Sequence, residues 1–149
     1  MIGSVSYTAG VISAFIDMPH SDLTIEINDE HIFSGKYLLT VIANGTYYGG
    51  GYKASPFSSL TDGRLNLVLV KLVSRREFIT LIGKYKKGTV HKTRKGKKLI
   101  TYLDFERARI VSKEETSVCV DGEIIKAKEL FLKVVPGGMN FSLPEKNEP

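Results

Sequence analysis

Short segments with the alternating pattern of β-strands recur along this chain, and they constrain its fold more than any other feature. In LTIEIND, the apolar residues Leu23, Ile25 and Ile27 alternate with polar ones, as expected for a strand with one buried face. Segments 36–44 and 64–73 are apolar on both faces and predict interior strands. Further strands are predicted at 99–111, 117–121, 128–135 and 139–143. The pattern favours a mostly β domain, a sandwich or barrel-like fold with one or two helices.

One segment has the features of an amphipathic helix. Ser74 and Glu77 have the spacing of a capping box, in which a hydroxyl and a carboxylate satisfy backbone N–H groups at a helix start. Apolar residues then recur every three or four positions and form one stripe, and Gly88 is a suitable end. The stripe consists of Phe78, Leu81, Ile82 and Tyr85.

The length of 149 residues suits a single domain that buries its own core. We expect a helical segment at 1–20, the β domain at 21–144 and a disordered tail at 145–149. The single cysteine, Cys119, excludes an internal disulfide and a multi-cysteine zinc site, and it fits a reducing compartment. No apolar run approaches the roughly 20 residues that a membrane-spanning helix needs, and the start lacks a signal-peptide pattern. These features predict a cytoplasmic protein.

The positive charge is local. The net charge is +5, yet residues 84–98, KYKKGTVHKTRKGKK, contain eight Lys or Arg and no acidic residue, so the rest carries 13 basic and 16 acidic residues. We expect 84–98 to be an exposed basic loop. It is either simply solvated, in contact with an anionic membrane surface, or bound to nucleic acid. Only Tyr85 interrupts the charges as an aromatic residue, which argues against base stacking and specific nucleic-acid recognition.

Two motif-bearing stretches remain. In NGTYYGGGYKASPFSSLTDGRL, Asn44-Gly45 has the composition of a tight hairpin turn, three glycines follow at 49–51, and Asp62-Gly63 predicts a second turn. In VCVDGEIIKAKELFLKVVPGGMNFSLP, residues 118–144, Asp121-Gly122 predicts a tight turn between two strands. Three consecutive glycines suggest a backbone that must adopt conformations closed to other residues.

The order of these motifs resembles the second domain of the diacylglycerol kinase catalytic family, which includes bacterial lipid kinases and sphingosine kinases. The resemblance covers residues 21–144. It implies a two-domain enzyme in which an α/β domain with a Gly-Gly-Asp-Gly-Thr loop binds ATP and a β-sandwich closes over the cleft. The chain contains neither that loop nor a phosphate-loop Gly-Lys-Ser/Thr. We therefore expect the N-terminal nucleotide-binding domain to be missing here, the chain alone to be inactive, and residues 1–20 to be the hinge-side segment.

The resemblance also implies site residues. The family's magnesium carboxylate matches Asp62, and its two carbonyl donors match Ser59 and Arg64. Arg64 departs from the family's usual leucine, so its guanidinium must point away if Mg²⁺ is to bind. The family's proton acceptor matches Glu123, which would receive the proton of the attacking lipid hydroxyl. A shared active site requires Asp62 and Glu123 to converge on one rim.

These inferences favour the C-terminal domain of an ATP-dependent lipid kinase that meets its lipid substrate at a membrane surface. The lipid acceptor is not identified by the sequence. A homodimer could form through an exposed sheet edge or the face meant for the missing domain. Two alternatives stay open: a stand-alone basic β-domain that binds nucleic acid or anionic surfaces, and a degenerate kinase-like scaffold.

Overall fold

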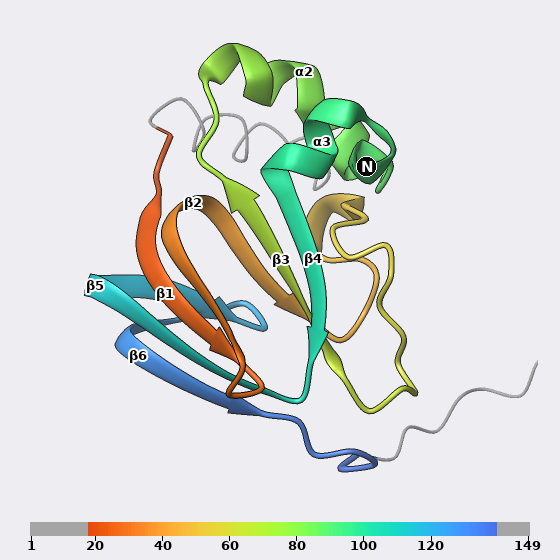
Figure 1. Cartoon of the computed structure of the whole chain (residues 1–149). Coiled ribbons are helices and arrows are strands. Elements are labelled where there is room, and N and C mark those ends of the chain that lie inside the picture. The colour runs from red at the N-terminus through yellow and green to blue at the C-terminus, as the bar shows by residue number, and fades with distance from the viewer. Residues whose placement is uncertain (1–17, 140–149) are drawn as a thin grey trace, which may run out of the picture.

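The computed structural model describes residues 18–139, which form one antiparallel sheet of six strands with two helices (Figure 1). The spatial order of the strands is β4-β3-β2-β1-β5-β6, and the sheet stays open. This arrangement confirms the prediction of a mostly β domain with one or two helices. The strands are β1 (Ser21–Ile27), β2 (His31–Ala43), β3 (Leu65–Lys71), β4 (Ile100–Phe105), β5 (Arg107–Val120) and β6 (Glu123–Lys133).

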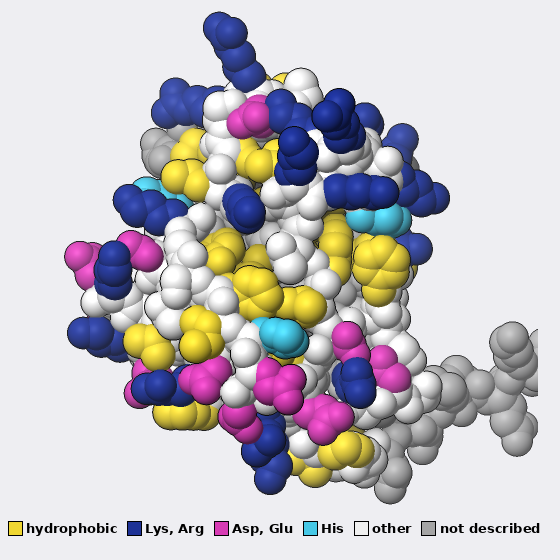
Figure 2. Space-filling view, viewed as in Figure 1, with side chains coloured by type: hydrophobic (Ala, Val, Ile, Leu, Met, Phe, Trp, Pro, Cys, Tyr) yellow, Lys and Arg dark blue, Asp and Glu magenta, His cyan; other side chains and the backbone are white. Residues whose placement is uncertain are grey.

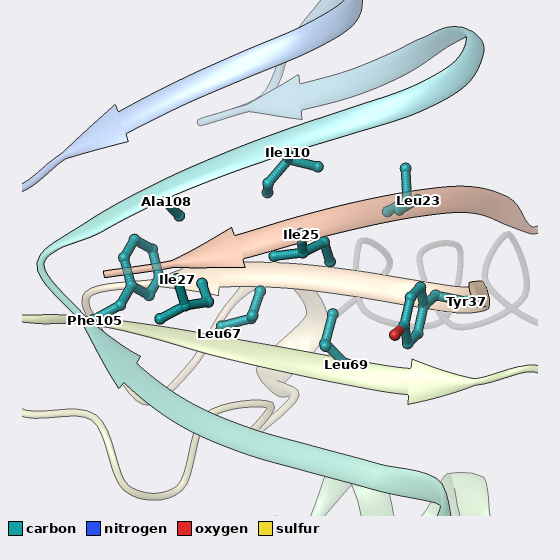
Figure 3. Packing of buried hydrophobic residues seen from close by; sticks show 9 residues of the cluster. All are labelled: Leu23, Ile25, Ile27, Tyr37, Leu67, Leu69, Phe105, Ala108 and Ile110. Carbon is teal, nitrogen blue, oxygen red and sulfur yellow. The ribbon is translucent and has the colours of Figure 1, made fainter. Parts of the chain in front are cut away.

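The long strand β2 joins two parts of the sheet. Its first half pairs with β1, where Tyr37 lies opposite Ser21, and its second half pairs with β3, where Ala43 lies opposite Asn66. Apolar side chains of β1 and β5 therefore meet those of β3 across one core (Figure 3). The core consists of Leu23, Ile25, Ile27, Tyr37, Leu67, Leu69, Phe105, Ala108 and Ile110.

The predicted capping box starts helix α2 (Arg75–Lys86). The backbone N–H of Glu77 donates to Ser74 Oγ at 3.4 Å, and the N–H of Ser74 donates to Glu77 Oε2 at 3.0 Å. The helix ends just before Gly88, whose φ of 66° is readily adopted by glycine. Both ends of this helix were therefore predicted from local sequence.

The prediction of a basic loop at 84–98 is wrong, because most of this segment is helical. After α2 come a 3-10 turn, η2 (Val90–Lys92), and a short helix, α3 (Arg94–Leu99). Thr93 caps α3 by accepting a hydrogen bond from the Gly96 N–H at 2.9 Å. Val90 is fully buried and fixes the turn against the sheet.

A second apolar cluster lies on the outer face of the sheet, under the two helices. It joins strand residues to residues of the long connections on either side of β3. The buried members are Tyr52, Ala54, Val68, Tyr85, Val90 and Ile100.

Several predicted boundaries shift in the structure. The segment 99–111 divides into the whole of β4 and the start of β5, with Glu106 between them. Strand β5 then runs on to Val120, where Asp121 and Gly122, with φ of 48° and 101°, form the predicted turn. Residues 1–17 of the helical segment predicted at 1–20, the tail and nearly all of the strand predicted at 139–143 fall outside the described residues, and residues 18–20 are not helical. Within residues 18–139, no helix is long and apolar enough to span a bilayer.

Candidate functional site

The glycine run belongs to a long connection, residues 44–64, which joins the adjacent strands β2 and β3. Asn44-Gly45 is therefore not a two-residue hairpin. Gly50 and Gly51 have φ of 71° and 72°, which glycine adopts without steric cost. The glycines reverse the chain, so that the Tyr48 N–H donates to the Tyr52 carbonyl at 3.1 Å and the two rings stack 5.9 Å apart. The run thus serves to fold the connection back on itself and bury Tyr52.

The connection is fastened to α2. The Lys53 N–H donates to the Lys86 carbonyl at 3.0 Å, and the Tyr52 ring lies 6.3 Å from the ring of Tyr85. The Lys86 ammonium lies 5.1 Å from the centre of the Tyr52 ring. Backbone, aromatic and cation–π contacts together fix the position of the connection relative to the helix.

The turn that carries the proposed metal ligand is formed by Asp62, Gly63 and Arg64. The Arg64 N–H donates to Asp62 Oδ1 at 3.0 Å, and Gly63 has a φ of 71°. The Asp62 side chain is exposed, and no group among residues 18–139 donates a hydrogen bond to its second oxygen, Oδ2. Nearby, the Thr61 N–H donates to Ser59 Oγ at 3.4 Å. The turn therefore holds one carboxylate oxygen outward.

The guanidinium of Arg64 points away from this turn, onto β4 and the corner that follows it. It forms an ion pair with Asp104, and its Nη2 lies 3.8 Å from Glu106 Oε1. The hydrogen bond with Asp104 raises the pKa of Arg64 and holds the pKa of Asp104 below its usual value. The cation thus pairs with two carboxylates other than Asp62, although the negative charge of Asp62 also contributes to the raised pKa of Arg64.

The donor set of this turn suits Mg²⁺, which takes hard oxygen ligands and keeps several waters. Asp62 offers one carboxylate, and the carbonyls of Ser59 and Arg64 lie in the same short segment. Among residues 18–139, no three His, Cys, Asp or Glu side chains gather in a way that could hold a metal ion. A metal bound here would therefore depend on backbone carbonyls and water in addition to Asp62.

Glu123 begins β6 directly after the Asp121-Gly122 turn and lies opposite Val120 in the β5–β6 hairpin. Its side chain is exposed. Ile124 and Ile125 follow it, and they are 73% and 43% exposed. The register of β5 and β6 shifts between residues 111 and 116, and the outer half of the hairpin bends there (Figure 1). An exposed carboxylate beside exposed apolar side chains suits a surface that another protein domain covers.

Asp62 and Glu123 make no direct contact with each other among residues 18–139. Gly63, next to Asp62, faces Pro136: a Cβ built on this glycine would lie 3.5 Å from the proline Cβ, beyond the C-terminal end of β6. Glu123 lies at the opposite end of the same strand. Within the described residues, no hydrogen bond or ion pair joins them. The convergence of Asp62 and Glu123 on one rim therefore stays a prediction.

An apolar cavity of about 50 Å³ lies between α2 and the outer face of the sheet. Burial raises the pKa of Tyr85, which lines it and remains a neutral phenol. Sequence reasoning found only the α2 stripe of this cavity, because its other walls come from β2, β3 and the 44–64 connection. The lining includes Leu39, Val70, Phe78, Leu81, Ile82 and Leu99.

Asp104 and Glu106 are further site residues that the sequence did not indicate. They lie forty or more positions from Arg64, and only the pairing of β3 with β4, which sets Asn66 opposite Asp104, brings them near it. The sequence predicted the two strands but not the register between them, so it could not predict this contact.

Comparisons with known proteins agree with this architecture. Residues 1–142 match the family model described as the YegS C-terminal NAD kinase beta sandwich-like domain. A protein of Stenotrophomonas maltophilia (strain K279a) named "Probable lipid kinase YegS-like" is 26% identical over 112 residues, which cover 75% of this chain and 35% of that protein.

Two solved structures of Bacillus anthracis str. Sterne proteins, assigned as diacylglycerol kinases, share the fold. The first superposes with a TM-score of 0.67 at 22% identity and covers 86% of this chain and 44% of its own. The second has a TM-score of 0.61 at 18% identity, with 83% and 43% covered. This chain spans less than half the length of the relatives that it matches.

Proposed function

This chain belongs to the family of the YegS C-terminal NAD kinase β-sandwich-like domain, and we propose that it is the C-terminal half of an ATP-dependent lipid kinase of the diacylglycerol kinase type. Such an enzyme transfers the γ-phosphate of ATP to a lipid hydroxyl. Because the chain spans less than half of its relatives, an N-terminal domain would supply the nucleotide site. The match of residues 1–142 to this family is the observation that carries the proposal.

Glu123 is the proposed proton acceptor. As the lipid oxygen bonds to the γ-phosphorus, its hydroxyl proton must leave, and a carboxylate within hydrogen-bond reach accepts it and orients the oxygen. The turn at 121–122 holds Glu123 at the tip of an exposed hairpin. Exposed Ile124 beside it supports a surface that the nucleotide-binding domain covers.

Asp62 is the proposed magnesium ligand, with the carbonyls of Ser59 and Arg64. When bound, Mg²⁺ would supply positive charge that counters the repulsion between phosphate groups and the protein's own carboxylates. Asp62 lies in the turn before β3 and Glu123 begins β6, and we assign them separate tasks. Asp62 orders the turn at the rim of the domain, and Glu123 handles the proton.

The apolar cavity beneath α2 is the proposed site for part of the lipid's hydrocarbon chain. Its walls are apolar side chains with the two phenol rings of Tyr48 and Tyr52 at one side. Burial of methylene groups there would contribute about 0.8 kcal/mol each. Because the lining is apolar and contacts only hydrocarbon, it would accept the chains of diacylglycerol, a sphingoid base or phosphatidylglycerol for the same reason.

The test is a chimera of this chain with the N-terminal portion of the Stenotrophomonas relative. Transfer of radiolabelled phosphate from ATP to lipids in detergent micelles is measured for the chimera and for the chain alone. We expect transfer only by the chimera. Glu123→Gln should lower its rate on the order of a hundredfold or more, since it removes the proton acceptor. Glu114→Gln, an exposed glutamate of β5, is the matched control and should leave the rate unchanged.

A chimera that is folded, binds ATP and phosphorylates none of the three lipid classes would contradict the proposal and favour a kinase-like scaffold. A measurable rate from the chain alone would contradict the assignment of ATP binding to another domain. Asp62→Asn should raise the Mg²⁺ concentration that the chimera needs for half-maximal rate. An unchanged Mg²⁺ requirement would remove Asp62 from the metal site.

A further inference from the structure

Residues 75–98, which we name the basic surface, concentrate the positive charge of the domain on two helices and the turn between them. They contain ten of the 21 Lys and Arg residues and only one of the 16 acidic residues, so the rest of the chain has 11 basic and 15 acidic residues. Figure 2 shows these cations gathered over the end of the molecule formed by α2 and α3. The molecule is therefore strongly polarised.

The charge of the basic surface is almost uncompensated. Its one acid, Glu77, pairs with Lys95 at 2.9 Å, and Lys86 lies over the Tyr52 ring. None of the other eight cations has a carboxylate of residues 18–139 within ion-pair distance. These eight are Arg75, Arg76, Lys84, Lys87, Lys92, Arg94, Lys97 and Lys98.

An apolar side chain stands among these cations. Ile79 is 72% exposed on α2, three and four positions after Arg76 and Arg75, which places all three on neighbouring turns of one helical face. Leu72, just before the helix, is 41% exposed. Cations that surround an exposed aliphatic residue are typical of helices that lie in a membrane interface.

The position of the basic surface fits such an orientation. α2 forms one wall of the apolar cavity, and Phe78, Leu81 and Ile82 on its inner face line it. The Asp62 turn precedes β3 and α2 follows it, so the two lie at opposite ends of a strand of seven residues, about 20 Å apart. A bilayer against α2 would leave the Asp62 rim accessible to another domain.

We propose that the basic surface docks this domain onto anionic lipid bilayers, with Ile79 entering the interface and the surrounding cations contacting lipid phosphates. Only the consequence, that docking brings lipid substrate to the cavity, rests on the proposed kinase function. A nucleic-acid partner fits less well. Phe78 and Tyr85 of this segment pack inward, the half-buried His91 ring lies 4.9 Å from that of Phe57, and a phosphate backbone has no use for Ile79.

The first experiment measures co-sedimentation of the whole chain with vesicles that contain neither diacylglycerol nor ATP, so its outcome is independent of kinase activity. Vesicles of phosphatidylcholine alone are compared with vesicles that contain phosphatidylglycerol, at low and high salt. We expect binding to the anionic vesicles only, and its loss at high salt because exposed charges are screened. Equal binding to both vesicles, or no binding to either, would overturn the proposal.

Two triple variants separate location from net charge. Arg94→Gln/Lys97→Gln/Lys98→Gln removes three exposed cations of α3, and Lys36→Gln/Lys126→Gln/Lys128→Gln removes three exposed cations of β2 and β6. Both leave the same net charge. We expect the α3 triple to weaken binding on the order of a hundredfold, about fivefold per cation, and the control triple to change it little. Equal losses would show nonspecific attraction and contradict the proposal. Thermal melts confirm that both variants are folded.

The chain contains no tryptophan, so a single substitution gives a clean reporter. Ile79→Trp should show a blue shift of its fluorescence on addition of anionic vesicles, whereas Ile124→Trp on the β5–β6 hairpin should not. The same samples are titrated with a DNA duplex. Binding of the duplex that depends on the α3 cations, with no blue shift of Trp fluorescence in vesicles, would reassign the basic surface to nucleic acid.

Discussion

The two long connections on either side of β3 both cover the outer face of the sheet, but they are ordered in different ways. Residues 44–64 join β2 to β3 and residues 72–99 join β3 to β4, although each pair of strands is adjacent and antiparallel. A two-residue turn would close either hairpin. Both connections instead fold onto the outer face of the sheet, where Tyr52 of one meets Tyr85 of the other.

The difference lies in what orders each connection. Residues 72–99 follow local rules: a capping box at Ser74, an apolar stripe, and a Thr93 cap for α3. Residues 44–64 form only a single 3-10 turn and depend on left-handed glycines and on contacts with α2. The helical connection is suited to present fixed charges on a rigid surface. The glycine-rich one is suited to bring backbone oxygens and a carboxylate into one tight turn.

The largest expected effect tests how far the helical connection depends on close packing. A Cβ at Gly96 would lie 2.0 Å from the Val90 carbonyl oxygen, a contact with backbone that no side-chain movement can relieve. Gly96→Ala should therefore lower the free energy of unfolding by about 4 kcal/mol, at the upper end for overpacked sites. Chemical denaturation followed by circular dichroism measures this.

Gly83→Ala is the matched control for that substitution. Gly83 lies in α2 with nothing within 4 Å of its Cβ position, so alanine there should stabilise the domain by about 0.5–1 kcal/mol. A loss below about 1 kcal/mol for Gly96→Ala would mean that α3 yields locally. The 72–99 connection would then be no more rigid than the glycine-rich one.

Local sequence was enough to predict the parts of the fold that local forces determine. The alternation around Ile25, the capping box at Ser74 and the turn at Asp121-Gly122 all have short-range causes, and all appear in the structure. The same reasoning missed α3. Its six residues RKGKKL have no amphipathic stripe, and its stability comes from the Thr93 cap and the close approach of Gly96 to Val90. Unless that tertiary contact is known, a lysine-rich segment of this kind is predicted to be a loop.

The turn that carries Asp62 was predictable from the sequence, but the arrangement of charged residues around it was not. The Asp62 turn forms because an Asp-Gly pair favours a tight turn, and Arg64 belongs to that turn because it follows the pair directly in the sequence. The positions of the other charged residues depend on the register of the strands. It sets Asp104 near Arg64, and it assigns Glu123 and Lys133 to opposite ends of β6. Register depends on all six strands together, so motif spacing along the chain cannot supply it.

A smaller effect tests whether the glycine run is needed for its conformation. Gly51 has a φ of 72° with open space around its Cβ position, so Gly51→Ala should cost about 1–2 kcal/mol through backbone conformation alone. Gly49 is exposed and lies outside the left-handed region, so Gly49→Ala should change the unfolding free energy by less than about 0.5 kcal/mol. Urea denaturation of both variants measures the difference. Equal costs would show that the run is constrained by something other than φ.

The smallest effect concerns the one acid of the basic surface. The hydrogen bond from Lys95, followed by those from the Ser74 backbone and side chain, lowers the pKa of Glu77 to about 2, against about 4.3 in an unfolded chain. A carboxyl with a depressed pKa stabilises the folded state above its unfolded pKa. That contribution is lost as the pH falls through 4 toward 2. Glu77→Gln keeps an acceptor for the cap but no charge, so its stability should fall less steeply than that of the wild type over this range.

Lys95→Gln separates the ion pair from the cap, because the Ser74 hydrogen bonds remain. If the ion pair dominates, denaturation midpoints of Lys95→Gln and Glu77→Gln between pH 5 and 2 should show a similarly weakened pH dependence. If Lys95→Gln instead behaves like the wild type, the cap alone depresses the pKa of Glu77. Lys95 would then contribute no more to stability than the other eight uncompensated cations. The helical connection would be ordered by backbone capping, just as the glycine-rich connection is ordered by backbone conformation.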